Sequence, residues 1–277
     1  MTLPDARTPA GSAGLAALLA DPARALVAVD YDGTLAPIID DPAAAVPHPE
    51  AVRALGTLAA VVGTVAIITG RPVHDVLRLG GVTGAAGLDR LVICGQYGLE
   101  RWSAETGELS SPEVSAGVRA ALREVPEILA SVGLQPGALE DKRHALAVHT
   151  RREPDPDAAL AVVEPKLRSV AAENGLEIVA GRYVLELRPP GIDKGRALLD
   201  LADERGCGSV VFAGDDLGDL PAFDAVEELR RRGIPGVLVC AGSAEVSVVA
   251  DRADLVVDGA DGVVALLTRL TAAVGAG

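Results

Sequence analysis

The chain of 277 residues contains few cysteines, aromatic residues and lysines. Its three cysteines, Cys94, Cys207 and Cys240, are widely spaced and form no CxxC pair, which excludes a disulfide framework and a zinc site of the usual ligand spacing. Each lies in or near an apolar segment, so we expect small buried thiols. There are only six aromatic residues, and three lysines stand against 22 arginines. A lysine within a motif is therefore notable in this chain.

Long hydrophobic runs are also missing. No apolar run approaches the roughly 18–20 residues of a membrane span. The apolar segment 14–20 is short and follows the acidic Asp5, so we expect a helix there rather than a secretion signal, and a cytoplasmic location. The net charge of −14 disfavours nucleic-acid and anionic-membrane partners, which need a basic surface. A small anionic substrate stays possible. The sequence does not indicate an oligomeric state, and a monomer is compatible with it.

The apolar pattern predicts an α/β fold with an insertion. Short β-branched runs at 26–30, 64–69, 91–95, 209–213 and 237–241 alternate with longer amphipathic segments, as in a doubly wound parallel sheet. Residues 107–189 instead indicate helix, strand, strand, helix, strand, strand, which is an α+β unit with one antiparallel sheet. We therefore predict a core domain formed by residues 1–106 and 190–277, and an inserted α+β domain at 107–189.

The first polar motif, DYDGT at 30–34, follows the first predicted strand. The carboxyl ends of strands in open parallel sheets are where ligands bind. Asp30 and Asp32 are two residues apart on the turn that leaves this strand, and their repulsion is costly unless a cation or a proton lies between them. The alternative is a turn or helix-capping pair of aspartates, since DG is common turn chemistry.

Two further motifs suit an anion. Thr69-Gly70-Arg71 follows the second strand, where a hydroxyl and a glycine that allows close backbone approach suit a phosphate oxygen. Thr69 could instead cap the helix that begins at Pro72. Lys194 lies at the start of a predicted helix, where its charge opposes the helix dipole. That position is favourable if an anion lies in front of it; the alternative is a solvated surface lysine.

The last motif, GDDLGD at 214–219, follows the strand at 209–213. Its three carboxylates lie within five residues and need compensation, and hard oxygen ligands suit Mg²⁺. A Ca²⁺ loop is disfavoured, because the segment lacks the D-x-D-x-D-G spacing and the distal glutamate of an EF-hand. Asp216 or Asp219 could instead cap the helix that follows.

Taken in order, these four motifs resemble those of the haloacid dehalogenase superfamily of aspartyl phosphatases. The resemblance covers about residues 24–106 and 190–270, and the insertion resembles that superfamily's large α+β cap. A finer resemblance, to the trehalose-6-phosphate phosphatase family, rests on LVAVDYDGTLAP (26–37), IITGRP (67–72), LEDKRHALAVH (139–149), YVLELRPPGIDKGRAL (183–198) and FAGDDLGDLPAF (212–223). The chain departs from the family where Gly218-Asp219-Leu220 replaces the usual Thr-Asp-Glu.

The resemblance implies an Mg²⁺-dependent phosphatase that hydrolyses trehalose 6-phosphate to trehalose and phosphate. Asp30 would be the nucleophile, and Asp32 the general acid and later the general base. Mg²⁺ would be held by Asp30, the backbone carbonyl of Asp32, and Asp215. Asp216 or Asp219 would bind metal-bound waters or orient the ligands. Gly218 and Leu220, which replace the usual Thr and Glu, would therefore lie next to the metal site without being metal ligands.

The resemblance also implies how the substrate is bound. The implied phosphate-binding residues are Asp30, Thr69, Gly70, Arg71 and Lys194. The implied sugar-binding residues, in the insertion, are Glu140, Lys142, Glu186, Arg151 and Arg188. Alternatively, Glu140 with Lys142 and Glu186 with Arg188 form salt bridges on the sheet surface. Related readings of the whole chain are a phosphatase for another sugar phosphate such as sucrose phosphate, a sugar phosphomutase, or an inactive sugar-phosphate sensor.

Overall fold

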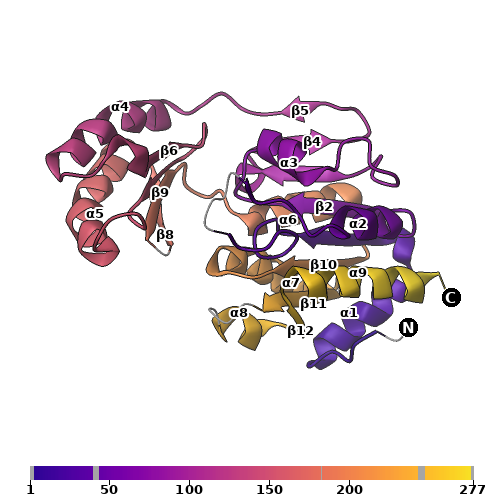
Figure 1. The fold of residues 1–277 in the computed structure, drawn as a ribbon. Coiled ribbons are helices and arrows are strands. Elements are labelled where there is room, and N and C mark those ends of the chain that lie inside the picture. The colour runs from indigo at the N-terminus through magenta and orange to yellow at the C-terminus, as the bar shows by residue number, and fades with distance from the viewer. Residues whose placement is uncertain (1–2, 40–43, 182, 243–246, 276–277) are drawn as a thin grey trace. The chain divides into compact units, whose positions relative to one another are not determined.

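The computed structural model describes residues 3–39, 44–181, 183–242 and 247–275. The chain divides into two compact units (Figure 1). The core unit comprises Met1–Ser110 and Asp193–Gly277, and the inserted unit comprises Ser111–Ile192. These limits lie a few residues after the predicted boundaries at 107 and 189. That the inserted unit acts as a substrate-reading cap stays a prediction.

The core unit is built on an eight-stranded sheet with the order β12-β11-β10-β1-β2-β3-β4-β5. The strands from β12 to β3 are parallel, and β4 and β5 pair antiparallel at one edge. Their bounds are β1 Ala25–Val29, β2 Thr64–Ile68, β3 Val92–Gly95, β4 Glu100–Ser103, β5 Leu109–Ser110, β10 Ser209–Gly214, β11 Gly236–Gly242 and β12 Leu255–Asp258. The sequence prediction of a doubly wound α/β fold is confirmed.

Helices cover both faces of this sheet, which is why its central strands are apolar throughout. Alternate residues of β1 serve two cores: Val27 and Val29 belong to one, Leu26 and Ala28 to the other. The first core includes residues of α1 (Pro9–Ala20), α2 (Ala51–Ala59) and α9 (Gly259–Val274), and the second includes residues of α6 (Lys194–Arg205) and α7 (Leu220–Arg231). Further helices among the described core residues are η1 (Pro22–Arg24), α3 (Val73–Gly80), η3 (Gln96–Gly98), η5 (Leu217–Asp219) and α8 (Ser247–Arg252).

The inserted unit is a four-stranded antiparallel sheet with the order β6-β7-β9-β8. Its strands are β6 Leu139–Asp141, β7 Leu146–His149, β8 Glu177–Gly181 and β9 Val184–Arg188, and its helices are α4 Ala116–Ser131, η4 Pro136–Ala138 and α5 Pro156–Glu173. Leu146, Val148, Leu185 and Leu187 form one core with α4 and α5. Side chains alternate along a strand, so the polar residues between them lie on the opposite face.

Local details differ from the sequence expectation in two places. The predicted polar break at 106–112 contains β5, which pairs with β4 through backbone bonds that ignore side-chain polarity. The predicted helix at 218–231 begins with the short η5 turn before α7. The three cysteines are free and buried, as expected. In the described part of the chain, no helix combines the length and hydropathy required to cross a bilayer.

Candidate active site

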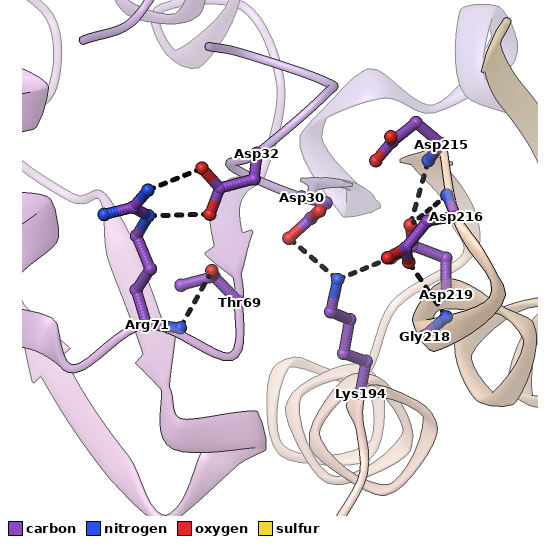
Figure 2. A network of polar contacts seen from close by, with 9 residues as sticks. All are labelled: Asp30, Asp32, Thr69, Arg71, Lys194, Asp215, Asp216, Gly218 and Asp219. Carbon is purple, nitrogen blue, oxygen red and sulfur yellow. Dashed lines mark hydrogen bonds and ion pairs between the residues drawn. The ribbon is translucent and has the colours of Figure 1, made fainter. Parts of the chain in front are cut away.

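The site lies where three adjacent parallel strands of the core unit end. Asp30 directly follows β1, Thr69 follows β2 and Asp215 follows β10, while Lys194 begins α6. Because β2, β1 and β10 are neighbours in the sheet, their carboxyl ends bring these side chains together (Figure 2). The sequence thus placed the motifs at the correct edge of the sheet.

Lys194 forms the centre of a buried ionic cluster. Its Nζ lies 2.8 Å from Asp30 Oδ1 and 2.7 Å from Asp219 Oδ1, and all three side chains are nearly inaccessible (Figure 2). Burial opposes the charge on Lys194, but Asp219 and Asp30 outweigh it and raise its pKa. Burial raises the pKa of Asp30 despite Lys194, and Asp219 and Asp215 add to the rise. One ammonium therefore does not neutralise the carboxylates around it.

Asp215 carries the remaining negative charge of the cluster. It is buried, and within the described chain no donor hydrogen-bonds to its carboxylate. Burial, together with Asp219 and Asp216, raises its pKa to about 8. The carboxylate lies directly against the backbone of Gly33, where an added Cβ would be 2.0 Å from Oδ2. Gly33 has φ +72°, so this glycine allows both the turn and the close approach.

The donor set suits a divalent cation. One carboxylate oxygen from each of Asp30, Asp215 and Asp219 lies within 4.8 Å of the others. These are hard oxygen ligands, and together they carry more negative charge than Lys194 offsets. Both oxygens of Asp219 are already engaged, whereas no residue that the structure describes donates a hydrogen bond to the Asp215 carboxylate. Asp30 and Asp215 are therefore the side chains best placed to hold a metal.

Asp216 and Asp219 organise the turn that presents Asp215. Asp219 Oδ2 accepts hydrogen bonds from the backbone N–H groups of Asp215 and Asp216, at 2.9 and 3.1 Å. Asp216 Oδ1 accepts one from Gly218 N–H at 2.8 Å, which completes a reciprocal capping box around η5. Asp216 therefore caps η5, whereas Asp219 closes the box from within η5 and makes no side-chain cap bond to α7. Asp219 additionally fixes Lys194.

Asp32 points away from this cluster. Its two carboxylate oxygens accept from Arg71 Nε and Nη2, each at 2.6 Å, and Figure 2 shows this pair on the other side of Asp30 from Lys194. The guanidinium also lies over the Tyr31 ring, 5.2 Å from its centroid. The sequence did not predict this pair. A bidentate arginine–carboxylate pair is geometrically specific, so Arg71 sets the orientation of Asp32.

The loop after β2 is fastened to the end of β3. Thr69 is buried, and its hydroxyl accepts from the backbone N–H of Arg71 at 3.1 Å. Backbone bonds join Gln96 N–H to Arg71 O and Tyr97 N–H to Thr69 O. The Tyr97 ring packs on Gly70, where a Cβ would come within 2.7 Å. This pairing holds the Thr69 hydroxyl at the end of β2, the neighbour of the strand that Asp30 follows.

Sequence reasoning missed the residues that support this loop. The buried carboxylate of Glu100 accepts from Val73 N–H at 2.7 Å, so Glu100, rather than Thr69, satisfies the first turn of α3. Gln96 and Tyr97 both have positive φ, at 50° and 59°. A buried glutamate and two strained residues have no local sequence signature; the glycine-rich GQYG segment at 95–98 is the only signal that could have pointed here.

Four proposed sugar-binding residues gather on the polar face of the inserted unit's sheet. Lys142 Nζ lies 2.6 Å from Glu186 Oε2, and Arg188 Nε lies 2.9 Å from Glu177 Oε1. Arg188 Nη1 also lies 3.9 Å from Glu186 Oε1. The expected pair of Glu186 with Arg188 is therefore present, but at a longer distance than the pair of Arg188 with Glu177.

Glu140, the fourth residue on this face, and Arg151, the fifth proposed sugar-binding residue, are more exposed. Glu140 Oε2 lies 2.7 Å from His149 Nε2. Glu140 on β6 pairs with Ala147 on β7, which pairs with Glu186 on β9. Glu140 and Glu186 therefore lie in one row across the sheet. Arg151 lies on an exposed turn after β7. The inserted unit thus collects four of the five residues on one face and leaves Arg151 at its edge.

Comparisons with known proteins agree on one family. A family model described as trehalose-phosphatase matches residues 28–258. A trehalose-phosphate phosphatase of Mycobacterium avium is 34% identical over 216 residues, covering 74% of this chain and 52% of that protein. The corresponding protein of Mycobacterium leprae is 34% identical over 223 residues, covering 76% of this chain and 49% of its own length. The chain spans about half the length of the curated relatives it matches.

Solved structures show the same fold. The C-terminal domain of trehalose-6-phosphate phosphatase from C. albicans has a TM-score of 0.78 at 24% identity, covering 98% of this chain and 99% of that one. Trehalose-6-phosphate phosphatase from Aspergillus fumigatus has a TM-score of 0.66 at 25% identity, covering 97% and 99%. A haloacid dehalogenase-like hydrolase from Bacteroides thetaiotaomicron has a TM-score of 0.58 at 18% identity, covering 88% and 98%.

Proposed function

The chain belongs to the trehalose-phosphatase family, and on that basis we propose that it hydrolyses trehalose 6-phosphate to trehalose and inorganic phosphate. The observation that carries the proposal is the buried Asp30, 2.8 Å from Lys194 and beside the Asp215 carboxylate, which has no hydrogen bond within the described chain. This arrangement provides a nucleophile, a fixed positive charge and a place for a cation at one point. These are the requirements for moving a phosphoryl group.

In the first half of the proposed reaction, an oxygen of Asp30 attacks the phosphorus atom. A bond forms between Asp30 and phosphorus, and the bond from phosphorus to the sugar oxygen breaks, giving an aspartyl-phosphate. Lys194 stays beside Asp30 and stabilises the negative charge on the transferring group, together with the Thr69 hydroxyl. Gly70 lets the backbone approach the phosphoryl oxygens closely.

Asp32 supplies and then removes the proton. We assign it as the acid that protonates the departing sugar oxygen, and as the base that takes a proton from the water that hydrolyses the aspartyl-phosphate. In the structure its carboxylate is held by Arg71. A phosphate group matches the guanidinium in the same bidentate way. Arrival of the substrate phosphate at Arg71 would therefore release Asp32, which takes up a proton from solvent and gives it to the sugar oxygen as the phosphorus–oxygen bond breaks.

Mg²⁺ is the cofactor we propose, held by Asp30, Asp215 and the backbone carbonyl of Asp32. When bound, it offsets the charge of the carboxylates and of the phosphate, so that one anion can approach another. Asp219 remains on Lys194 and on the turn, so it orients the cluster rather than joining the ligands. Gly218 and Leu220 leave this arrangement intact, because the bonds around Asp219 come from the backbone and from Lys194.

The inserted unit is proposed to read the sugar through residues on the polar face of its sheet. These are Glu140, Lys142, Glu186 and Arg188, with Arg151 at the edge. Ion pairs such as Lys142–Glu186 keep the charged groups oriented, and sugar hydroxyls can exchange into them. Sites that hydrogen-bond a hydroxyl discriminate strongly against ligands that leave such groups unpaired. Specificity for trehalose 6-phosphate would therefore reside in this unit, and phosphoryl chemistry in the core.

Phosphate release from a panel of sugar phosphates tests the proposal. Trehalose 6-phosphate should be the best substrate, ahead of sucrose 6-phosphate and glucose 6-phosphate, and chelation of divalent metal should abolish release. Asp30→Asn should lose turnover, whereas Asp200→Asn, an exposed aspartate on α6, should behave as wild type. Turnover by Asp30→Asn would refute the nucleophile. A better substrate than trehalose 6-phosphate would refute the specificity.

A second measurement separates sugar reading from chemistry. Lys142→Met and Glu186→Gln should raise KM for trehalose 6-phosphate and leave hydrolysis of p-nitrophenyl phosphate, which has no sugar, near the wild-type rate. Lys166→Met, on α5 away from that sheet face, is the matched control and should change neither. Equal loss on both substrates would remove these residues from the sugar site.

A further inference from the structure

A cavity of about 270 Å³ opens in the core unit at the amino ends of the central strands. Its lining includes Ala25 at the start of β1 and Thr64 at the start of β2, with Cys207 just before β10. The proposed active site lies at the carboxyl ends of these same strands. Five-residue strands are roughly 17 Å long, so a ligand here would not touch the reacting groups.

Three arginines line this cavity in a chain whose net charge is −14. They are Arg24, Arg90 and Arg205, and a single carboxylate, that of Glu105, lines it with them. Burial raises the pKa of the Cys207 thiol to about 11, while Arg205 and Arg24 both lower it, which shows that two of the charges act on the same spot. The cavity is therefore locally cationic.

Two of the guanidinium groups are held in place by backbone carbonyls. Arg24 donates from Nε and Nη2 to Gly206 O, at 3.2 and 2.9 Å, and Arg90 donates from Nη2 to Gly63 O at 2.7 Å. The turn bearing Arg24 is itself fixed on both sides, by Gly63 N–H to Pro22 O and Gly208 N–H to Arg24 O, each at 2.8 Å. Holding the arginines in advance lowers the entropy cost of binding.

Among the described residues, neither of these anchored arginines has an acidic partner. In the parts of the chain that the structure describes, no carboxylate lies within salt-bridge distance of Arg24 or Arg90. Arg205 lies 3.8 Å from a Glu204 oxygen, but Glu204 is already paired with Arg101. Several exposed arginines of this chain do pair with a nearby acid, as Arg196 does with Asp200. The remaining guanidinium N–H groups suit the oxygens of an incoming anion.

We propose that this cavity binds a small polyanion through Arg24, Arg90 and Arg205. The volume decides the class of ligand, because sites for drug-sized molecules run from about 300 to 1,000 Å³. A cavity at or below that range holds a pyrophosphate or a tricarboxylate rather than a nucleotide. The shared chemistry is a compact group of two or more negatively charged oxygens, from phosphate or from carboxylate.

Calorimetric titration of metal-free protein with inorganic pyrophosphate and with citrate tests this site without any enzymatic turnover. Wild type should bind at least one of them saturably, with one ligand per chain and a Kd in the millimolar range or below. The tighter of the two identifies phosphate or carboxylate as the preferred chemistry. Because no hydrolysis is measured, failure here and failure of the proposed phosphatase activity are separate results.

Three variants locate the binding. Arg90→Gln/Arg205→Gln should weaken it about tenfold or more, since two charge-assisted contacts are lost. Glu105→Gln should strengthen it several-fold, a gain that misfolding cannot produce. Arg196→Gln, on the same helix as Arg205 but outside the cavity, should bind as wild type. Unsaturable binding in wild type, unchanged binding in the double variant, or weaker binding in Glu105→Gln would overturn the proposal.

Discussion

Replacing Asp219 by asparagine tests how the acidic cluster is held together. Asp219 takes three donors on two oxygens: Lys194 Nζ on Oδ1, and the backbone N–H groups of Asp215 and Asp216 on Oδ2. Asparagine has one acceptor oxygen. If it faces the backbone donors, its NH₂ group faces the ammonium of Lys194, so the buried ion pair is lost whichever way the amide is turned.

Breaking a buried pair by removing one partner costs about 3–5 kcal/mol. Because Lys194 keeps Asp30 at 2.8 Å, we expect Asp219→Asn to lose about 3 kcal/mol of the core unit's unfolding free energy. Trp102, the only tryptophan, packs against the core of this unit, so its fluorescence during urea unfolding reports the core unit. The expected loss corresponds to a decrease in Tm of roughly 6–12 °C.

Asp216→Asn is the matched control for this measurement. Asp216 is exposed, and its carboxylate accepts cap bonds from backbone N–H groups of η5 such as that of Gly218. Asparagine caps as well as aspartate. We expect a change below about 0.5 kcal/mol. If Asp219→Asn unfolds within about 1 kcal/mol of wild type, or no more easily than Asp216→Asn, the reasoning that Asp219 holds Lys194 by a buried charge is refuted.

Three further predictions concern the same core unit. Gly33→Ala should abolish Mg²⁺-dependent phosphate release, because its Cβ displaces the Asp215 carboxylate. Gly81 also has a positive φ, +61°, but open space around it, so Gly81→Ala should lose only stability. Equal activity in the two variants would contradict this. Mg²⁺ should raise Tm, by the equivalent of about 2.7 kcal/mol at one hundred times its Kd, and Asp215→Asn should remove most of that gain in a thermal melt. Burial raises the pKa of all three cysteine thiols to about 11, above the usual value near 9. At pH 9 only about 1% of each is therefore thiolate in the folded chain. Between about pH 9 and 11 the folded state keeps these protons while the unfolded state loses them, so the free energy of unfolding should fall as pH rises over this range. Native protein should also resist thiol reagents until it is denatured. Rapid labelling of any native cysteine would contradict this.

Much of the core could be predicted because its signals are local. A strand buried on both faces must be apolar throughout, so the apolar run at 26–30 by itself predicts a buried central strand. A parallel sheet then brings every strand's carboxyl end to one edge, and Asp30, Thr69 and Asp215 follow three such strands. The order of motifs was therefore enough to predict which residues would meet.

The partners of those residues were not predictable, because they depend on side-chain geometry across distant segments. Asp32 and Arg71 form a bidentate pair although they lie 39 positions apart. Lys142 pairs with Glu186, 44 positions away. Period-2 alternation places Glu140 and Glu186 on one face of their sheet but leaves open which charges pair. Tertiary packing makes that choice.

The inserted unit divides the core unit in the sequence, and this has a consequence for synthesis. The central strand β1 pairs with β10, about 180 residues later in the chain. On the ribosome, β1 can pair with β2 early, but its other edge stays open until the whole of Ser111–Ile192 has emerged. That segment is contiguous and has its own hydrophobic core, so it can fold first and replace a long flexible loop by a compact body. The last-made strands of the chain therefore complete the sheet that its first strand begins.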